Sequence, residues 1–317
     1  MRALILAAGL GTRLRPLTSV RAKAAVPVNG TSLIARAISW LVSEGIGDLV
    51  VNLHHRPESV ARLVGDGGSL GARVRYSWEQ PVLGSAGGPR HALPLLVNGS
   101  DDTSFLMVNG DTLTSLSLRD FTATHQECGA LVTMALIENP RPDMYGGVAV
   151  DDGWITGFAR PGAARQSYHF IGVQAARASA FGRLEDGVPA ESVMGLYPQL
   201  IRESARALRA YVVDAPFKDI GTPADYLQTS LDLASVEGDR MASGAGAVID
   251  MSAVVRRSAI WDGVTVGPHS HLDECIVCDG VAVPAGSTYR RCALVPFRGQ
   301  PVQQDERVEG ALLVRSF

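Results

Sequence analysis

The chain has 317 residues, enough for one large domain and a smaller one, each with its own hydrophobic core. Hydrophobic residues make up 46% of it and charged residues 19%, a composition typical of globular rather than disordered proteins. The formal net charge of -3 argues against a basic surface for nucleic acid or anionic lipid, and no apolar run approaches the roughly 20 residues that cross a bilayer.

The first two thirds of the chain alternate short apolar runs with amphipathic stretches. Four runs predict strands, namely Arg2–Ala7, Asp48–Leu53, Ala72–Trp78 and Phe105–Val108. Three stretches between them predict helices, namely Ser32–Glu44, Pro57–Val64 and Pro89–Leu96. This alternation predicts a Rossmann-like α/β fold, with a mixed, mainly parallel sheet and helices on both faces. Ligands in such sheets bind beyond the carboxyl ends of the strands.

A glycine-containing loop follows the first predicted strand. Gly9 and Gly11 are separated by one residue, so backbone N–H groups there can turn toward an anion without an intervening Cβ. A triphosphate suits such a cradle, and Arg13 can add a charged contact. An ordinary pair of loop glycines is the alternative. The loop lacks the Gly-Lys-Ser/Thr of a Walker motif and the third glycine of a dinucleotide fingerprint.

The segment Leu6–Thr18, followed by Lys23 and Pro27, closely resembles the signature of the sugar-1-phosphate nucleotidylyltransferases. Four further segments match this family in the same order, namely Glu79–Gly87, Asn109–Asp111, Tyr145–Gly147 and Asp219–Pro223. The likeness covers about residues 1–235. It implies a nucleotide-binding α/β domain, Mg²⁺, and in-line attack of a sugar 1-phosphate on a nucleoside triphosphate with release of pyrophosphate.

Two aspartates end apolar segments and are candidate metal ligands. Asp111 follows Val108-Asn109-Gly110, and Asp219 follows Phe217-Lys218 and precedes a glycine turn. A single strand-end aspartate usually caps a helix or forms a turn. Two carboxylates together with phosphate oxygens and water are the ligands that Mg²⁺ prefers. We therefore expect Asp111 and Asp219 to hold one Mg²⁺.

The resemblance also assigns cationic and nucleotide-binding positions. Arg13 and Lys23 match the charges around the triphosphate and the departing pyrophosphate, so that Arg13, Lys23 and Asp111 are the expected catalytic residues. The family usually has proline before this lysine, and this chain has Ala22. The expected nucleotide-binding residues are Leu6, Ala8, Gly9, Gly11, Thr12, Arg13, Glu79, Gly84 and Ser85.

The segment that holds the nucleobase in the family matches Glu79 and the loop Leu83–Gly87. A carboxylate at Glu79 could accept from both N–H donors on the edge of guanine, whereas uracil and thymine offer one. This favours GTP. A glutamate at the solvated end of a strand is the alternative interpretation.

The sugar side departs further from the family pattern. The usual Glu-Lys-Pro triplet corresponds to Ala159-Arg160-Pro161, and the usual Asn-Ala-Gly corresponds to Phe170-Ile171-Gly172, which is closer to the muramic-acid uridylyltransferase branch. We expect Gly147, Arg160 and Gly172 to contact the sugar phosphate, with Gly147 under the sugar where a side chain would obstruct it. The sugar itself stays open.

The last quarter of the chain has a six-residue period. Val248, Val254, Ile260, Val266, Leu272 and Cys278 recur at this spacing, which predicts hexapeptide repeats with these residues packed inward. The region resembles the left-handed parallel β-helix appended to many members of the same family. The predicted domains are therefore residues 1–235 for catalysis, 236–246 as linker and 247–317 as a short β-helix. So few coils usually need a partner, which predicts a homo-oligomer.

Zinc and disulfides are weaker interpretations of the same region. His269, His271, Cys275 and Cys278 are of zinc-ligand type, yet Cys278 is in phase with the inward apolar column. Four cysteines in a chain of this length do not indicate a disulfide framework, and we expect a cytoplasmic protein.

Three functional hypotheses follow. The first is an enzyme that makes an NDP-sugar, with GTP and mannose 1-phosphate as its substrates. The second keeps the reaction but uses UTP or dTTP with glucose 1-phosphate or N-acetylmuramate 1-phosphate. The third is a non-catalytic regulatory subunit that binds a nucleotide sugar. Arg13, Lys23, Asp111 and Asp219 argue against the third, while Ala22, Ala159 and Phe170 leave it open.

Overall fold

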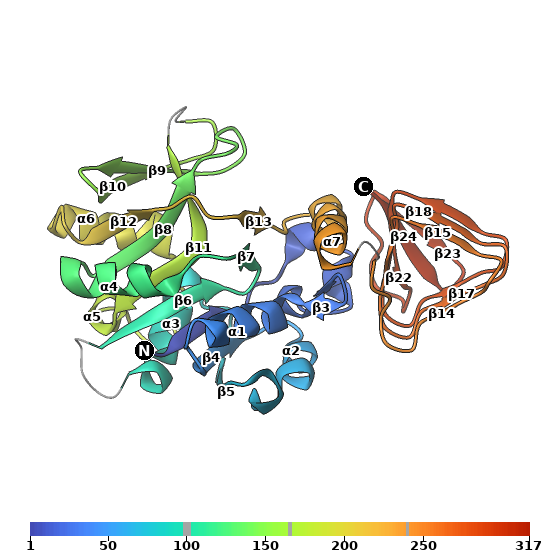
Figure 1. Ribbon diagram of the computed structural model, residues 1–317, viewed down its shortest axis with the longest axis horizontal. Helices are drawn as coiled ribbons and strands as arrows, with labels where there is room; N and C mark the ends of the chain where they lie inside the picture. The colour runs from blue at the N-terminus through green and yellow to red at the C-terminus, as the bar shows by residue number, and fades with distance from the viewer. Residues whose placement is uncertain (98–102, 164–166, 239–240) are drawn as a thin grey trace. The chain divides into compact units, whose positions relative to one another are not determined.

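The computed structural model describes residues 1–97, 103–163, 167–238 and 241–317. The chain forms two compact units (Figure 1). Unit 1 contains Met1–Gly9 and Ile34–Lys218, and unit 2 contains Leu10–Leu33 and Asp219–Phe317. Over the described ranges, no helix has the length and apolar character required to span a bilayer.

Unit 1 is built on a large sheet. Over the described residues the sheet has nine strands in the order β5-β4-β1-β6-β11-β8-β12-β10-β9. The first four positions are parallel and are filled by β5 (Arg73–Trp78), β4 (Asp48–Leu53), β1 (Ala3–Leu6) and β6 (Ser104–Asn109). These are the four strands that the sequence predicts, and each is confirmed to within one residue at either end. The apolar residues of β4, β1 and β6 are buried on both faces, as parallel strands require, whereas the edge strand β5 is partly exposed.

The rest of the sheet is mixed rather than mainly parallel. β11 (Tyr168–Arg177) runs antiparallel to β6 and to β8 (Val132–Glu138), and β12 (Leu208–Val212) runs parallel to β8. β9 (Gly147–Asp151) and β10 (Trp154–Ala159) form a hairpin over Asp152-Gly153. Both turn residues have positive φ, as two-residue hairpins favour. The expectation of a mainly parallel sheet is therefore wrong for this half.

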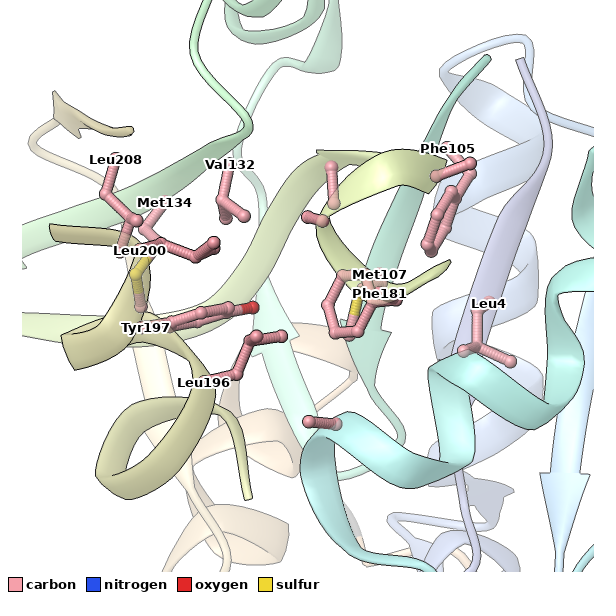
Figure 2. Close-up of a cluster of buried hydrophobic side chains, with 14 of the residues drawn as sticks. Leu4, Phe105, Met107, Val132, Met134, Phe181, Leu196, Tyr197, Leu200 and Leu208 are labelled. Carbon is pink, nitrogen blue, oxygen red and sulfur yellow. The ribbon is translucent and has the colours of Figure 1, made fainter. Parts of the chain in front are cut away.

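Helices cover the sheet on both faces. On one face α3 (Gly84–Leu96), α5 (Ala178–Gly182) and α6 (Tyr197–Glu203) pack on alternate strand residues, and Figure 2 shows Met107, Phe181 and Tyr197 inside this cluster. On the opposite face α4 (Leu118–Cys128) packs on β12 through Phe121 and Tyr211, whose ring centroids are 5.4 Å apart. Near α4, Trp40 of α1 (Leu33–Ser43) donates to the Leu116 carbonyl.

The predicted helices agree with the structure in two of three cases. α1 matches Ser32–Glu44 to within one residue, and α2 (Pro57–Val64) has the predicted bounds. α3 begins at Gly84, five residues before the predicted start at Pro89, because the glycine-rich segment forms its first turn. The shorter elements of the unit are η4 (Gly68–Leu70), β7 (Thr112–Thr114) and η5 (Ser192–Leu196), and β13 (Phe217–Asp219) lies at the boundary with unit 2.

Unit 2 joins residues 10–33 to the C-terminal part of the chain. The first segment contains the 3₁₀ turns η1 (Thr12–Leu14), η2 (Leu17–Ser19) and η3 (Lys23–Ala25) and the hairpin of β2 (Pro27–Val28) and β3 (Thr31–Ser32). α7 (Pro223–Glu237) starts with a capping box, in which the side chains of Thr222 and Asp225 each accept from the other's backbone N–H. Trp261 donates to Tyr226 of α7, and Tyr226 donates to the Pro27 carbonyl.

The last part of unit 2 is a coil of parallel strands in three columns (Figure 1). The columns are β14 (Val248–Ile249), β17 (Thr265–Val266) and β20 (Ala282–Val283); β15 (Val254–Arg256), β18 (His271–Asp273) and β21 (Thr288–Arg290); and β16 (Ala259–Ile260), β19 (Ile276–Val277) and β22 (Cys292–Pro296). β24 (Leu312–Ser316) pairs antiparallel with β22 and with β23 (Glu306–Glu309). The parallel coil is as expected, and its left-handedness stays a prediction.

The coil repeats every 17 residues, as the stacking of Ser258 under Cys275 shows. Three strict hexapeptides would repeat every 18, so one side of each coil is a residue shorter. The inward columns are therefore Ile249, Val266 and Val283; Val255, Leu272 and Tyr289; and Ile260, Val277 and Leu294. The six-residue column is correct at Ile260, Val266 and Leu272. It is wrong at Val248, which is 61% exposed, at Val254, whose neighbour Val255 is the inward residue, and at Cys278, which is buried outside this core cluster.

The predicted linker 236–246 overlaps elements of unit 2. Val236 and Glu237 belong to α7, and Ser243 forms a β-bridge with Ile260. Residues 239–240 lie outside the described residues. The four residues of zinc-ligand type do not gather, because the side chains of His269 and His271 are exposed while Cys275 and Cys278 are buried.

Candidate functional site

The carboxyl ends of β5, β4, β1 and β6 form one edge of the sheet in unit 1, which we call the carboxyl edge. Leu6 at the end of β1 is level with Asn52 of β4 and Asn109 of β6. The Gly110 N–H donates to the Leu6 carbonyl at 2.9 Å. The segment Ala7–Gly9 and Asp111 therefore leave the sheet side by side. Of the predicted site residues, the structure brings together Leu6, Ala8, Gly9 and Asp111 here.

A buried hydrogen-bond chain links three of the strand ends at this edge. The Ala7 N–H donates to Asn52 Oδ1 at 2.6 Å, and Asn52 Nδ2 donates to Glu79 Oε1 at 2.6 Å. Glu79 Oε2 accepts from the Leu83 N–H at 2.8 Å. Asn52 and Glu79 are 2% and 1% exposed. Both carboxylate oxygens are engaged inside the protein, and the contact between Glu79 and the edge of the base stays a prediction.

The predicted base-binding loop is the first turn of α3. The N–H groups of Ala86 and Gly87 donate to the Ala190 carbonyl, and Ser85 Oγ donates to Glu191 at 2.6 Å. A Cβ on Gly84, which has a φ of 76°, would lie 2.7 Å from the Ala190 carbonyl oxygen. Gly84 and Ser85 thus hold the segment 190–192 against the helix, a contact that the sequence pattern does not reveal.

Unit 2 brings together the other predicted phosphate-binding residues. Gly11 has a φ of 60°, and a Cβ on it would lie 2.7 Å from Thr18 Cγ2 and 3.2 Å from Lys23 Cβ. Thr12 and Arg13 follow in η1, and both are exposed. A Cβ on Gly221 would lie 3.0 Å from Arg13 Nη1 and 3.4 Å from Asp219 Oδ2. The Arg13 guanidinium therefore lies beside the Asp219 turn.

The two candidate metal ligands belong to different units. Asp111 lies at the carboxyl edge of unit 1, and Asp219 lies in unit 2, so their shared Mg²⁺ site stays a prediction. Among the residues that the structure describes, no group of three or more His, Cys, Asp or Glu side chains is placed to hold a metal ion. Two carboxylates are hard oxygen donors that suit Mg²⁺, which commonly completes its shell with substrate phosphates and water.

The predicted sugar residues fall into two places in unit 1. Gly172 lies at a bulge in β11 with a φ of 81°, and a Cβ there would lie 2.2 Å from Thr112 Oγ1 and 2.9 Å from Asn109 Nδ2. Gly172 therefore packs on the segment that carries Asp111. Gly147 pairs with Ala159 in the β9–β10 hairpin, and the exposed Arg160 follows directly. A Cβ on Gly147 would lie 2.7 Å from Ser167 Oγ.

Several residues near these positions are not among the predicted site residues. Tyr145 stacks on His169 with centroids 4.4 Å apart, and His169 lies 5.1 Å from Phe217. His54 Nδ1 is 2.9 Å from the Glu79 carbonyl oxygen. The sequence carries one signal for the buried hydrogen bonds at this edge. Asn52 is a polar residue that follows the apolar residues Leu49–Val51 in β4, and a buried amide must find hydrogen-bond partners.

Several known proteins are similar to this chain in sequence. A mannose-1-phosphate guanylyltransferase of Mycobacterium tuberculosis is 26% identical over 301 residues, which cover 91% of this chain and 83% of the relative. A UTP–glucose-1-phosphate uridylyltransferase of Synechocystis is 27% identical over 331 residues, covering 93% and 84%. An N-acetylmuramate alpha-1-phosphate uridylyltransferase of Neisseria meningitidis is 38% identical over 146 residues, covering 44% and 60%.

The fold is likewise shared with solved structures. HddC from Yersinia pseudotuberculosis matches with a TM-score of 0.63 at 20% identity, over 73% of this chain and 99% of HddC. Residues 2–236 match the nucleotidyl transferase family profile. That range contains the whole carboxyl edge, the η1 turn and the Asp219 turn. Because the matched range spans most of the sequence, the chain belongs to the nucleotidyl transferase family.

Proposed function

We propose that the protein is a sugar-1-phosphate nucleotidylyltransferase, which converts a nucleoside triphosphate and a sugar 1-phosphate into an NDP-sugar and pyrophosphate. The observation that carries the proposal is the carboxyl edge, where the start of the glycine loop and Asp111 leave adjacent parallel strands in a chain of this family. Named relatives that act on sugar 1-phosphates cover more than nine tenths of the chain.

In the proposed reaction an oxygen of the sugar phosphate attacks the α-phosphorus of the triphosphate. A new P–O bond forms, the bond between the α-phosphorus and the bridging oxygen breaks, and pyrophosphate leaves with the bonding electrons. Bound Mg²⁺, held by Asp111 and Asp219, would neutralise charge on the phosphate oxygens. Arg13 and Lys23 would stabilise the charge on the leaving group, and backbone N–H groups from Ala8 to Thr12 would orient the triphosphate.

On the sugar side, Gly147 and Gly172 would leave room for the hexose, and Arg160 would bind its phosphate. The Cβ directions of both glycines point at protein atoms, Ser167 Oγ and Thr112 Oγ1, so packing within the protein also requires glycine at both positions. The exposure of Arg160 leaves its guanidinium accessible to an anion.

GTP and mannose 1-phosphate are the proposed substrates. With Glu79 buried, the support for guanine comes from relatives named as mannose-1-phosphate guanylyltransferases, among them proteins of Mycobacterium tuberculosis and rice. A uridylyltransferase is the second candidate, favoured by the Synechocystis and Neisseria relatives and by Phe170-Ile171-Gly172 in β11.

A matrix assay of pyrophosphate release tests the proposal. The protein is incubated with GTP, UTP, dTTP or ATP, each with mannose, glucose or N-acetylmuramate 1-phosphate, in Mg²⁺ and in excess EDTA. We expect the highest kcat/KM for GTP with mannose 1-phosphate and no turnover in EDTA. Highest activity with UTP would select the second candidate. No release from any pair would contradict the enzyme assignment and favour a regulatory subunit that binds a nucleotide sugar.

We further propose that the first coil mediates homo-oligomerisation. Its strand β14 is an outer strand of its column, and Val248, Ile249 and Met251 there are 61%, 37% and 102% exposed. Unpaired strand edges and exposed apolar side chains favour association. The double substitution Val248→Lys and Met251→Glu should yield monomers in light scattering. Val236→Lys on α7 is the matched control and should leave the mass unchanged. An unchanged mass of the double variant would contradict this interface.

A further inference from the structure

We propose that Glu79 and Asn52 act as a positioning pair for the glycine loop and do not contact the nucleotide themselves. The pair connects the segment after β1, the end of β4, the residue after β5 and the residue before α3. The inference deepens the proposed function, because the segments it connects are those assigned to the nucleotide.

Burial and donor chemistry define what the pair does. An ionised carboxylate only accepts hydrogen bonds, and an amide side chain both accepts and donates. The hydrogen bonds therefore converge on Glu79. The Ala7 N–H, the Leu83 N–H and Asn52 Nδ2 are the donors, and Asn52 Oδ1 and both oxygens of Glu79 are the acceptors. These three hydrogen bonds are 2.6 to 2.8 Å long. The Ala7 and Leu83 residues at its ends are 6% and 2% exposed.

Packing around the pair leaves no freedom for another arrangement. A Cβ on Gly88 of α3 would lie 2.4 Å from Glu79 Oε1 and 2.9 Å from Asn52 Nδ2. The helix backbone thus presses on the pair from one side. The Glu79 backbone is fixed as well, because its N–H donates to the Leu53 carbonyl and its own carbonyl oxygen lies 2.9 Å from His54 Nδ1.

Ala7 is the residue through which the buried pair fixes the start of the glycine loop. It directly precedes Ala8 and Gly9. Its N–H donates to the side chain of Asn52 rather than to the backbone of a neighbouring strand. Fixing that N–H sets the direction in which the next backbone N–H groups point. At the other end, the Leu83 N–H fixes the residue before the first turn of α3. A shift of about 1 Å at either place is enough to misalign a reacting phosphate.

The polarity of the chain allows a test by exchange. In Glu79→Gln, the single carbonyl oxygen can accept from Leu83 only if the new NH₂ faces the NH₂ of Asn52. Rotating the Asn52 amide moves the conflict to the Ala7 N–H. In the double variant Glu79→Gln/Asn52→Asp, the aspartate accepts from both Ala7 and Gln Nε2, so every hydrogen bond is restored with the same net charge.

The experiment compares wild type, both single variants and the double variant. It measures KM for each substrate, kcat, nucleotide Kd by calorimetry without sugar phosphate, and hydrogen exchange at the amide of Ala7. We expect each single variant to weaken nucleotide binding about tenfold, to accelerate exchange at Ala7 and to leave KM for the sugar phosphate within about threefold. The double variant should return to within about threefold of wild type. Glu58→Gln, on the exposed side of α2, is the matched control.

Each outcome separates the alternatives. If Glu79 contacts the base, Glu79→Gln alters the ratio of GTP to UTP affinity without faster exchange at Ala7, and the double variant does not recover; that result overturns the proposal. Rapid exchange of the Ala7 amide in the wild-type protein also overturns it, whatever the variants do. A wild type that binds nucleotide but releases no pyrophosphate refutes the proposed function, while the calorimetric and exchange arms still test the pair.

Discussion

Both units contain parallel strands, and the two sets of strands place polar side chains in different ways. In unit 1, strands of four to six residues are joined by helical crossovers, so their carboxyl ends meet at one edge. Asn52, Glu79 and Asp111 converge there from distant parts of the sequence. In unit 2, strands of two or three residues are joined by tight turns, so each polar side chain stacks on the equivalent residue of the next coil.

The turns of the coil show what stacking produces. Arg257, Glu274 and Arg291 follow one another at a corner, all with positive φ, and Glu274 lies 3.2 Å and 3.9 Å from the two arginines. Neighbouring Asp273 lies 3.4 Å from Arg290. Signs alternate from coil to coil, and the arginine side chains are more than half exposed. The comparison indicates that the carboxyl edge depends on single groups, whereas the coil spreads its polar contacts over many.

The largest effect should follow the loss of the carboxylate at the edge. We expect Asp111→Ala to reduce kcat for pyrophosphate release by about 10³-fold or more. The proposed Mg²⁺ would lose a ligand, and the charge on the phosphate oxygens would be less well neutralised. Circular dichroism should show an unchanged fold. Glu127→Ala, an exposed acid on α4, serves as control and should retain full rate. Full activity of the Asp111 variant would remove this residue from the proposed machinery.

A methyl group at Gly172 should be the next most damaging change. The residue has positive φ and its Cβ would meet Thr112 Oγ1 at 2.2 Å, so Gly172→Ala should lower the free energy of unfolding by about 3 kcal/mol. In β10, Gly157 has open space around its Cβ position and no positive φ, and Gly157→Ala provides the matched control. Urea denaturation of both variants measures the difference. Equal midpoints would show that the bulge relaxes freely.

A pH effect is expected from His125 on α4. Burial, with a smaller contribution from the charge of Arg177, lowers the pKa of His125 to about 4. Its ring lies 2.8 Å from Thr133 and 3.1 Å from Ser104. In the unfolded chain His125 binds a proton near its ordinary pKa of 6.5. The contribution of neutral His125 to the free energy of unfolding is therefore complete above pH 6.5 and is lost as the pH falls toward 4.

The loss over that range amounts to about 3 kcal/mol at most. Denaturation midpoints followed from pH 7.5 to 4.5 should fall more steeply in the wild type than in His125→Asn, which cannot take up the proton. Parallel slopes in the two proteins would contradict the assignment. His91, which is partly exposed beside Asp186, allows a control substitution of an accessible histidine.

Within unit 2, one buried arginine should matter more than any stacked pair. Arg21 binds Asp262 and Asp279, and its side chain is 12% exposed. Burial alone would lower its pKa, but the hydrogen bonds and charges of the two aspartates outweigh it and raise the pKa above the ordinary value. We expect Arg21→Gln to destabilise the protein by about 2 kcal/mol.

The contrasting change is Glu274→Gln at the exposed corner of the coil, for which we expect less than about 0.5 kcal/mol. Thermal denaturation at low and at high salt measures both variants. The Glu274 effect should vanish at high salt, whereas most of the Arg21 effect should persist. A corner variant as damaging as the Arg21 variant would refute the idea that stacked contacts share the load.

Local pattern was sufficient for much of the fold. The strands β1, β4 and β6 are apolar runs, and β5 alternates polar with apolar residues, so the limits of all four follow from the sequence. The strands from β8 to β12 were not predicted, because they are placed by pairing with one another across long sequence separations rather than by a local period. In the coil, one shortened side per repeat moves the inward position by a residue, which a fixed six-residue count cannot follow.

The candidate site divides in the same way. Motif order identified Gly9, Gly11 and Asp111 as candidates, and the pairing of β1 with β6 puts Gly9 and Asp111 at the carboxyl edge. The role of Glu79 could not be deduced, because a strand-end glutamate is exposed in most proteins and only the structure reveals Asn52 and Leu83 as its partners. Likewise, the spacing of Gly172 gave no sign that it faces Thr112.

The 17-residue repeat of the coil also determines how this part of the gene can grow or shrink. Duplicating 17 residues would add one whole turn and keep every column in phase. Inserting six residues would shift each later side by one position around the axis, placing aliphatic residues at solvent-facing corners. Length changes tolerated in this region should therefore come in whole turns, a rule set by backbone register rather than by the identity of any single side chain.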